Sequence, residues 1–145
     1  MRLVTLQASD KKYFGRSASE GRELSAYALP THIIWRKLYK IQRGVYNDTL
    51  CLFFSDKYGM FMNCPPLGGP HRKDTLEACF DEMDKINTNP AVSRIENIEE
   101  RDIAWYYSNG YAVVEKFCEY LCNTQRIGLL SGDRFKSQRA NVNYF

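Results

Sequence analysis

The sequence lacks any long hydrophobic run. None of its 145 residues belongs to a stretch approaching the roughly eighteen apolar residues that a membrane span requires. Residues 1–5 also lack the apolar core of a secretory signal. We therefore expect a cytoplasmic protein with no transmembrane segment. Internal repeats and low-complexity segments are absent too, so we expect one domain, long enough to bury a core.

Residue types that bind metals are scarce or badly spaced. His32 and His71 are the only histidines, and neither lies near a Ser or Cys in a nucleophile motif such as G-x-S-x-G. Cys118 and Cys122 lie four residues apart, whereas zinc sites favour C-x₂-C pairs. No metal site is expected. The five cysteines lie in apolar segments, which predicts buried free thiols in a reducing compartment.

Strong charge of one sign is also missing. The chain has 20 Lys and Arg against 17 Asp and Glu, a formal net charge of +3. This permits an anionic partner but does not demand one, since dedicated nucleic-acid-binding domains are usually more basic. Aromatic residues, by contrast, are abundant at 14%, which predicts an aromatic-rich core.

Short turns divide the middle of the chain into strands. Asn47 and Asp48 suit a two-residue hairpin turn, and residues 56–59 suit a second turn. We expect three antiparallel strands, at residues 39–46, 49–55 and 60–64. Before them, a strand is expected at residues 3–6, a helix capped by Ser9, and a short helix within residues 25–35 with Pro30 in its first turn.

The second half predicts alternating helices and strands. Asp74 with Glu77, and Asn97 with Glu100, resemble capping boxes that open helices. We expect helices at residues 74–86, 97–107 and 124–130, and strands at residues 91–95 and 111–117. This order predicts an α/β (α+β) fold with a mixed central sheet and helices on both faces. The order of elements resembles the GNAT (acetyltransferase-like) fold.

The last fifteen residues form a basic, amphipathic segment. Phe135, Val142 and Phe145 fall within about one helical face, while Arg134 and Lys136 point elsewhere. A helix whose apolar face continues to the final residue is typical of one that packs against something further along the chain. We therefore expect a partner surface for this segment.

Several motifs carry a family resemblance. They are an aromatic segment from Tyr27 to Trp35, a P-x-G loop at residues 66–68, Glu119-Tyr-Leu-Cys122, and a terminal pattern that includes Leu130, Gly132, Arg139, Asn143 and Phe145. Together they resemble the C-terminal-domain family of phosphatidylglycerol lysyltransferases. The chain departs from that pattern with Glu119 in place of Asp, Cys122 in place of Tyr, Gln138 in place of Lys and Ala140 in place of Asn.

The resemblance implies a tandem arrangement of two GNAT-like modules. Residues 1–131 would be the first module and residues 132–145 the helical junction to the second. It further implies acyl or aminoacyl transfer, with coenzyme A or aminoacyl-tRNA as possible donors and a lipid headgroup as a possible acceptor. A second module, or another copy in a homo-oligomer, would pack on the junction. The alternative is a non-catalytic binding or scaffolding module.

The loop before the helix at residue 74 is the first candidate site. Phosphates of coenzyme A occupy this place in GNAT enzymes, and free N–H groups, the helix dipole and basic side chains favour an anion there. The candidate residues are Gly68, Gly69, His71, Arg72 and Lys73. Against this site, the R/Q-x-x-G-x-G/A signature is missing, and Pro65, Pro66 and Pro70 remove donors. A turn followed by a solvated helix start remains the alternative.

The second candidate site would contact substrate or the other module. Its residues are Glu119, Arg134, Lys136, Arg139 and Asn143. The basic members could contact tRNA phosphates or a lipid headgroup, or could form a solvated helix face. Glu119 could act as a general base or anchor a nearby Arg. A basic and aromatic stretch at residues 36–46 could stack bases, or could alternate between the two faces of a strand.

Overall fold

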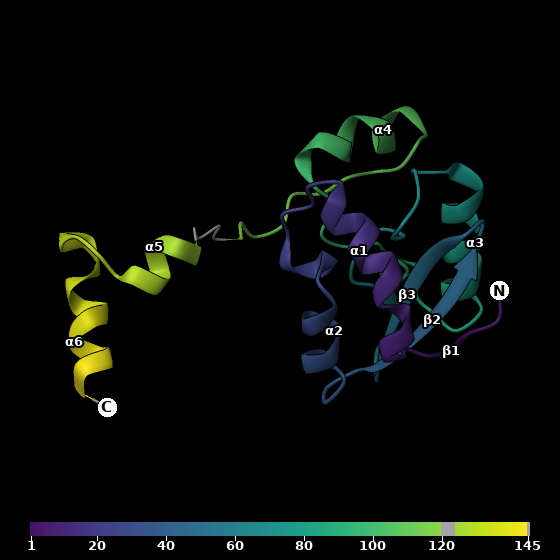
Figure 1. Ribbon diagram of the computed structural model, residues 1–145. Helices are drawn as coiled ribbons and strands as arrows, with labels where there is room; N and C mark the ends of the chain where they lie inside the picture. Colours follow the sequence, from purple (N-terminus) through teal and green to yellow (C-terminus); the bar gives the residue numbers. More distant parts are fainter. Residues whose placement is uncertain (120–123, 145) are drawn as a thin grey trace.

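A four-stranded antiparallel sheet organises the chain, whose computed structural model describes residues 1–119 and 124–144 (Figure 1). The strands follow one another across the sheet in chain order, each antiparallel to its neighbour. They are β1 (Val4–Thr5), β2 (Lys40–Tyr46), β3 (Thr49–Asp56) and β4 (Gly59–Met62). The predicted three-strand meander is confirmed.

Local chemistry explains both hairpins. Asn47 and Asp48 take positive φ values of 49° and 57°, as a two-residue turn between Tyr46 and its partner Thr49 requires. In the second turn, Oδ1 of Asp56 accepts a hydrogen bond from the backbone N–H of Tyr58 at 2.8 Å. The first six residues of β3 are buried, which its continuous apolar sequence predicts for a central strand.

Helices cover both faces of the sheet, as predicted. On one face, α1 (Lys11–Ser19) and α2 (Leu29–Trp35) lie over a core that contains Leu52 and Phe54. On the other face, α3 (Lys73–Asp84) packs over Cys51 and Phe53 through Cys79 and Met83. Alternate residues of β3 therefore pack into two separate cores, because successive side chains of a strand point to opposite faces of the sheet.

The predicted strand at residues 91–95 is replaced by a 3-10 turn, η3 (Pro90–Val92). Oδ1 of Asn89 accepts a hydrogen bond from the N–H of Ala91 at 3.0 Å and so begins that turn. Only Ile95 reaches the sheet, in an isolated parallel bridge to Met62. The expected mixed sheet is thus an α+β arrangement in which all four strands run antiparallel.

The three predicted helix caps are wrong: Ser9 lies inside a 3-10 turn, Asp74 lies inside its helix, and Asn97 binds a distant residue. Ser9 lies inside η1 (Ala8–Asp10), where the Asp10 carboxylate accepts from the N–H of Gln7 at 2.9 Å. α3 begins at Lys73, with Arg72 as its N-cap, and Asp74 instead binds Arg72.

Asn97 is also not a cap. Its φ is 53°, and its Nδ2 donates to the backbone carbonyl of Asn63 at 2.7 Å. The helix that follows begins as η4 (Glu100–Asp102) and continues as α4 (Ile103–Ser108). It ends at residues 109–110, as predicted, with Gly110 at φ 86°.

The predicted strand at residues 111–117 is wrong. These residues run over the surface without sheet pairing, and the side chains of Val114 and Phe117 are 86% and 95% exposed. Ile86, expected on the apolar face of α3, is exposed as well, since the helix ends at Asp84. An apolar alternating sequence forms a strand only where a sheet edge is available to pair with it.

The predicted helices near the C-terminus are confirmed. They are α5 (Thr124–Leu129) and α6 (Lys136–Tyr144), with the short turn η5 (Asp133–Phe135) between them. Figure 1 shows α5 and α6 standing apart from the sheet and its helices. Val142, part of the expected apolar face, is exposed, and Phe145 lies outside the described residues.

Three of the described cysteines, Cys51, Cys64 and Cys79, are buried free thiols, as predicted. Cys118 is exposed, which corrects the expectation for that residue, because its segment runs over the surface. Cys122 lies outside the described residues. Within the described part of the chain, no helix is long and apolar enough to cross a bilayer.

Candidate functional site

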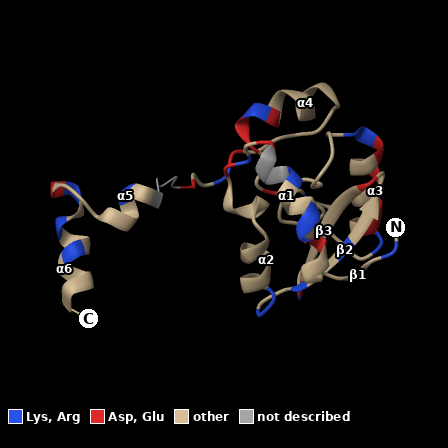
Figure 2. Ribbon diagram, in the orientation of Figure 1, with Lys and Arg blue, Asp and Glu red and all other residues tan. Residues whose placement is uncertain are grey.

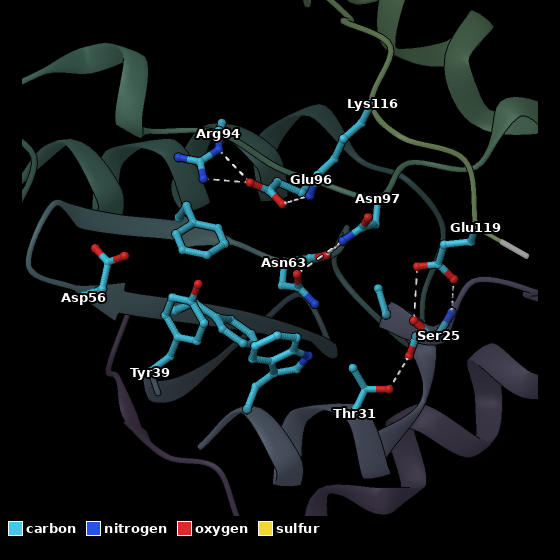
Figure 3. A pocket seen from close by; sticks show the side chains of 14 residues that line it. Ser25, Thr31, Tyr39, Asp56, Asn63, Arg94, Glu96, Asn97, Lys116 and Glu119 are labelled. Atoms are coloured by element: carbon cyan, nitrogen blue, oxygen red, sulfur yellow. Dashed lines mark hydrogen bonds and ion pairs between the residues drawn. The ribbon is translucent and has the colours of Figure 1, made fainter. Parts of the chain in front are cut away.

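A cavity of about 430 Å³ lies on the face of the sheet that α2 covers. Its walls come from four segments: α2 with the residues around it, the adjacent ends of β3 and β4, residues 94–97 and residues 116–119. Figure 3 shows polar side chains from these segments gathered around a group of aromatic rings. The cavity therefore joins parts of the chain that are far apart in sequence.

Aromatic rings form the floor of the cavity. Phe54 and Phe61 are register partners on β3 and β4, with ring centroids 5.7 Å apart. Tyr39 packs edge-on against both rings, at 5.6 and 5.7 Å, and Trp35 packs edge-on against Tyr39 at 5.9 Å. No described residue hydrogen-bonds the Tyr39 hydroxyl, so it can donate to a ligand.

Arg94, Glu96 and Lys116 form a charged wall. Glu96 pairs with Lys116 and accepts from Nε of Arg94 at 2.7 Å (Figure 3), while the Arg94 guanidinium lies over the Phe61 ring at 4.5 Å. Burial alone would raise the pKa of Glu96, but the hydrogen bonds from Lys116 and Arg94 outweigh it and lower that pKa. The wall therefore presents a fixed carboxylate between two cations.

Glu119 lies on the opposite wall, bound to Ser25. Its Oε2 accepts from the backbone N–H of Ser25 at 3.0 Å, and its Oε1 accepts from the Ser25 hydroxyl at 3.1 Å (Figure 3). The Thr31 hydroxyl donates in turn to the Ser25 carbonyl at 2.7 Å. These bonds hold the carboxylate in place, and its described partner is Ser25 rather than the expected Arg.

A hydrogen-bonded pair of amides completes the polar rim. Nδ2 of Asn97 donates to the Asn63 carbonyl at 2.7 Å and to its side-chain oxygen at 3.2 Å. This link fixes the segment after Ile95 against the end of β4. The left-handed backbone of Asn97 turns the chain at this point.

Behind the cavity, His32 is a buried core residue, as expected from its apolar surroundings. Its Nε2 lies 2.9 Å from the Ala26 carbonyl, and its ring packs against Phe14 and Phe54. Burial lowers the pKa of His32 to about 4, so the ring is neutral at pH 7. His32 supports the cavity wall and does not line it.

The loop at residues 68–73 is tightly integrated into the fold. Gly68 has φ 83°, and a Cβ there would lie 3.0 Å from the Tyr13 ring. A Cβ on Gly69 would lie 2.7 Å from the Thr49 hydroxyl. The Gly68 carbonyl accepts from Arg16 at 3.3 Å. Close packing thus accounts for both glycines.

The basic residues of that loop all have acidic partners within the chain. Nε2 of His71 lies 3.2 Å from Asp102, and the Arg72 guanidinium binds Asp74 through two nitrogens. Lys73 lies 3.9 Å from Glu77. The loop and the cavity are separate places in the structure, since none of these residues lines the cavity.

A charge network lies beneath α4, next to His71. Arg22 binds both Glu99, at 3.2 Å, and Asp102. Burial alone would raise the pKa of Glu99, but backbone N–H groups of Glu23 and Leu24 and the Arg22 guanidinium lower it. Each of these charges has a partner of opposite sign, so the network holds the start of the η4–α4 helix to the segment that follows α1.

The candidate residues of the C-terminal segment lie away from the cavity. Arg134 stacks on Phe135 at 4.7 Å, and Arg139 donates to the carbonyls of Leu130 and Gly132. Lys136 and Asn143 are exposed. Of all the predicted site residues, Glu119 alone lines the cavity.

Sequence reasoning missed most of the cavity. Arg94, Glu96, Asn97 and Lys116 lie in or beside segments that were expected to be strands or helix caps. The local signal that could have found the first two is the pair of opposite charges that flanks Ile95. Their grouping depends on the parallel bridge between Met62 and Ile95, which no local pattern indicates.

Comparisons with known proteins find no match for this chain among family models, curated proteins or solved structures.

Proposed function

We propose that this chain is the substrate-binding first module of a GNAT-like acyl- or aminoacyltransferase. The observation that carries the proposal is the cavity: an aromatic floor, two fixed carboxylates and a pair of cations around about 430 Å³. Small-molecule sites are concave and combine aromatic side chains with polar groups that fix the orientation of the ligand, and this cavity has both, with polar residues in the majority. Glu119, which stands at the acidic position of the family motif, belongs to this cavity.

The topology supports a GNAT-like origin. After the antiparallel meander, the chain crosses through α3 and returns parallel to β4, where Met62 donates to the Arg94 carbonyl and accepts from the N–H of Glu96, both at 2.9 Å. A helical crossover between parallel segments is a feature of α/β acyltransferase-like sheets. Here that parallel return is one bridge long.

A non-catalytic binding module is the second candidate, favoured by the loop at residues 68–73. His71, Arg72 and Lys73 are engaged by acidic partners, and Asp74 occupies the start of α3. An incoming coenzyme A phosphate would have to displace these contacts. Under this candidate the cavity binds a ligand, and no acyl donor binds the loop.

Calorimetry with the purified chain separates the two candidates. Coenzyme A, acetyl-coenzyme A and an aminoacyl-tRNA would each be titrated into wild type, Glu119→Gln, and Arg72→Ala with Lys73→Ala. Glu115→Gln is the matched control, because Glu115 lies on the same segment, is exposed and does not line the cavity.

The transferase proposal expects donor binding that Arg72→Ala with Lys73→Ala abolishes and that Glu119→Gln weakens about tenfold. Binding weakened by Glu119→Gln alone supports the non-catalytic module. The transferase proposal is contradicted if none of the three ligands binds. It is also contradicted if Glu119→Gln and Glu115→Gln bind the ligand with equal affinity.

A further inference from the structure

The end of α2 carries a continuous exposed apolar surface. Ile34 and Leu38 are 69% and 71% exposed, and Ile33 and Trp35 between and beside them are exposed as well. A seven-residue helix that buries His32 would be expected to turn polar residues outward at these positions. Exposed apolar groups that are contiguous usually mark an interaction surface.

Basic side chains surround this surface. Arg36, Lys37 and Lys40 are exposed, and none of them forms an ion pair with a described residue. Residues 24–47 contain no Asp or Glu. Figure 2 colours the turn after α2 as Lys and Arg. In this respect the turn differs from the cavity and from the loop at residues 68–73, where the cations are matched by carboxylates.

The β3–β4 turn extends the same surface. Lys40 pairs with Ser55 in the sheet, so the turn at residues 57–58 lies at the same end of the sheet as the end of α2. Tyr58 is exposed there, and the Lys57 ammonium lies 4.8 Å from its ring centroid. We call residues 33–40 together with Lys57 and Tyr58 the apolar–basic tip.

We propose that the apolar–basic tip docks the chain on an anionic lipid bilayer. Trp, Tyr and long aliphatic side chains partition into the interface between headgroups and acyl chains, while Lys and Arg are attracted to the negative surface. The tip combines both properties on a helix end and a neighbouring turn. Trp35 and Tyr39 belong both to the tip and to the wall of the cavity, so the two features adjoin each other.

A bilayer fits the tip better than a second copy of the chain does. An isologous dimer through this surface would bring the cations of one copy close to those of the other. Asp56 lies beside Lys57, but one carboxylate cannot neutralise the four cations Arg36, Lys37, Lys40 and Lys57. The apolar residues also occupy a short projecting helix end, which inserts shallowly but offers little of the area that a stable protein interface buries.

Vesicle co-sedimentation tests this inference, which does not depend on the proposed transferase function. Wild-type protein would be mixed with vesicles of phosphatidylcholine alone or with about one third phosphatidylglycerol, in low and high salt. The tip variants are Ile34→Ser with Leu38→Ser, and Arg36→Gln with Lys37→Gln. Val114→Ser with Phe117→Ser is the matched control, because it also removes two exposed apolar side chains.

Wild type is expected to bind the anionic vesicles and to dissociate in high salt. The charge variant should bind about 30-fold more weakly, because each Lys or Arg near such a surface contributes about 1 kcal/mol. The apolar variant should bind at least tenfold more weakly than wild type, and the control should bind as tightly as wild type.

Three results would overturn the inference. They are no binding of wild type to anionic vesicles, binding by both tip variants that equals that of wild type, and a wild-type dimer that the apolar variant converts to monomer. The last result would assign the tip to a second copy. Because all the substituted side chains are exposed, each variant is expected to fold, and circular dichroism melting checks this.

Discussion

The Glu119 carboxylate binds both the backbone N–H and the hydroxyl of Ser25, a residue 94 positions earlier in the chain. This contact ties the segment after α4 to the start of the helical layer and closes one wall of the cavity. We expect it to be measurable as an energetic coupling between the two residues.

A double-mutant cycle with Glu119→Gln and Ser25→Ala measures that coupling. Each single variant is expected to lower the free energy of unfolding by about 0.5–1.5 kcal/mol, because Glu119→Gln removes the charge of the acceptor and Ser25→Ala removes the hydroxyl donor. The double variant should lose less than the sum of the two. Additive losses in urea unfolding would show that the contact does not form in solution.

His32 should make stability fall below neutral pH. Its folded-state pKa is about 4, against the ordinary 6.5, because burial disfavours the charged ring. Between these values the unfolded chain binds a proton that the folded chain does not, so the contribution is complete above pH 6.5 and falls with pH. By pH 5 it should have decreased by about 2 kcal/mol.

Urea unfolding of wild type and His32→Gln at pH 6.8 and pH 5 checks this dependence. Glu96 and Glu99 have lowered pKa values, so the stability that they contribute is lost mainly below their ordinary pKa of 4.5, and the change between pH 6.8 and pH 5 reports chiefly on the histidine. The variant should show the smaller loss between the two pH values. An identical loss in both proteins would contradict the assignment.

Gly68→Ala should destabilise the chain by about 2–3 kcal/mol. It places an L residue at φ 83° and brings its Cβ to 3.0 Å from the Tyr13 ring. Gly110→Ala is the control, because Gly110 has φ 86° but faces open space. Thermal melts should therefore show a loss of about 1 kcal/mol for Gly110→Ala, and equal losses would rule out the Tyr13 contact as a cause.

Asp102→Ala should lower the free energy of unfolding by about 3 kcal/mol. It leaves Arg22, which is mostly buried, without one of its two carboxylates, and it also removes the partner of His71. Glu100→Ala, at a solvent-exposed position two residues earlier, should change stability by less than about 0.5 kcal/mol. Similar denaturation midpoints for the two variants would contradict the network.

Cys118 should react with iodoacetamide within minutes, since its side chain is exposed. Cys51, Cys64 and Cys79 are buried and should react only in denaturant, and burial also raises the pKa of the Cys64 thiol. Peptide mass spectrometry after brief labelling measures each site separately. Early labelling of Cys51 or Cys79 would mean that the core under α3 opens readily.

The parts of the fold that sequence predicted are those with local causes. Asn47 and Asp48 adopt positive φ readily and set the register of the first hairpin. The uninterrupted apolar run of β3 has one stable environment, the centre of a sheet covered on both faces. Helices at α3, α5 and α6 likewise follow from local periodicity.

The failures have a shared cause, which is competition from distant partners. Asn97 donates to Asn63 and Asp74 accepts from Asn47, so neither side chain caps its helix as predicted. Residues 111–117 contain strand-favouring Tyr, Val and Phe but pair with no strand of the sheet. The cavity was missed for the same reason, apart from Glu119.

By itself, the sequence determined the meander, the two-sided core and the helical C-terminal segment, because turn chemistry and hydrophobic period act within a few residues. Tertiary structure alone decided where Ile95 meets Met62 and where Glu119 meets Ser25. Those contacts join segments separated by 33 and 94 positions. Their formation depends on how the helices and the sheet pack in space, and it is this packing that produces the cavity.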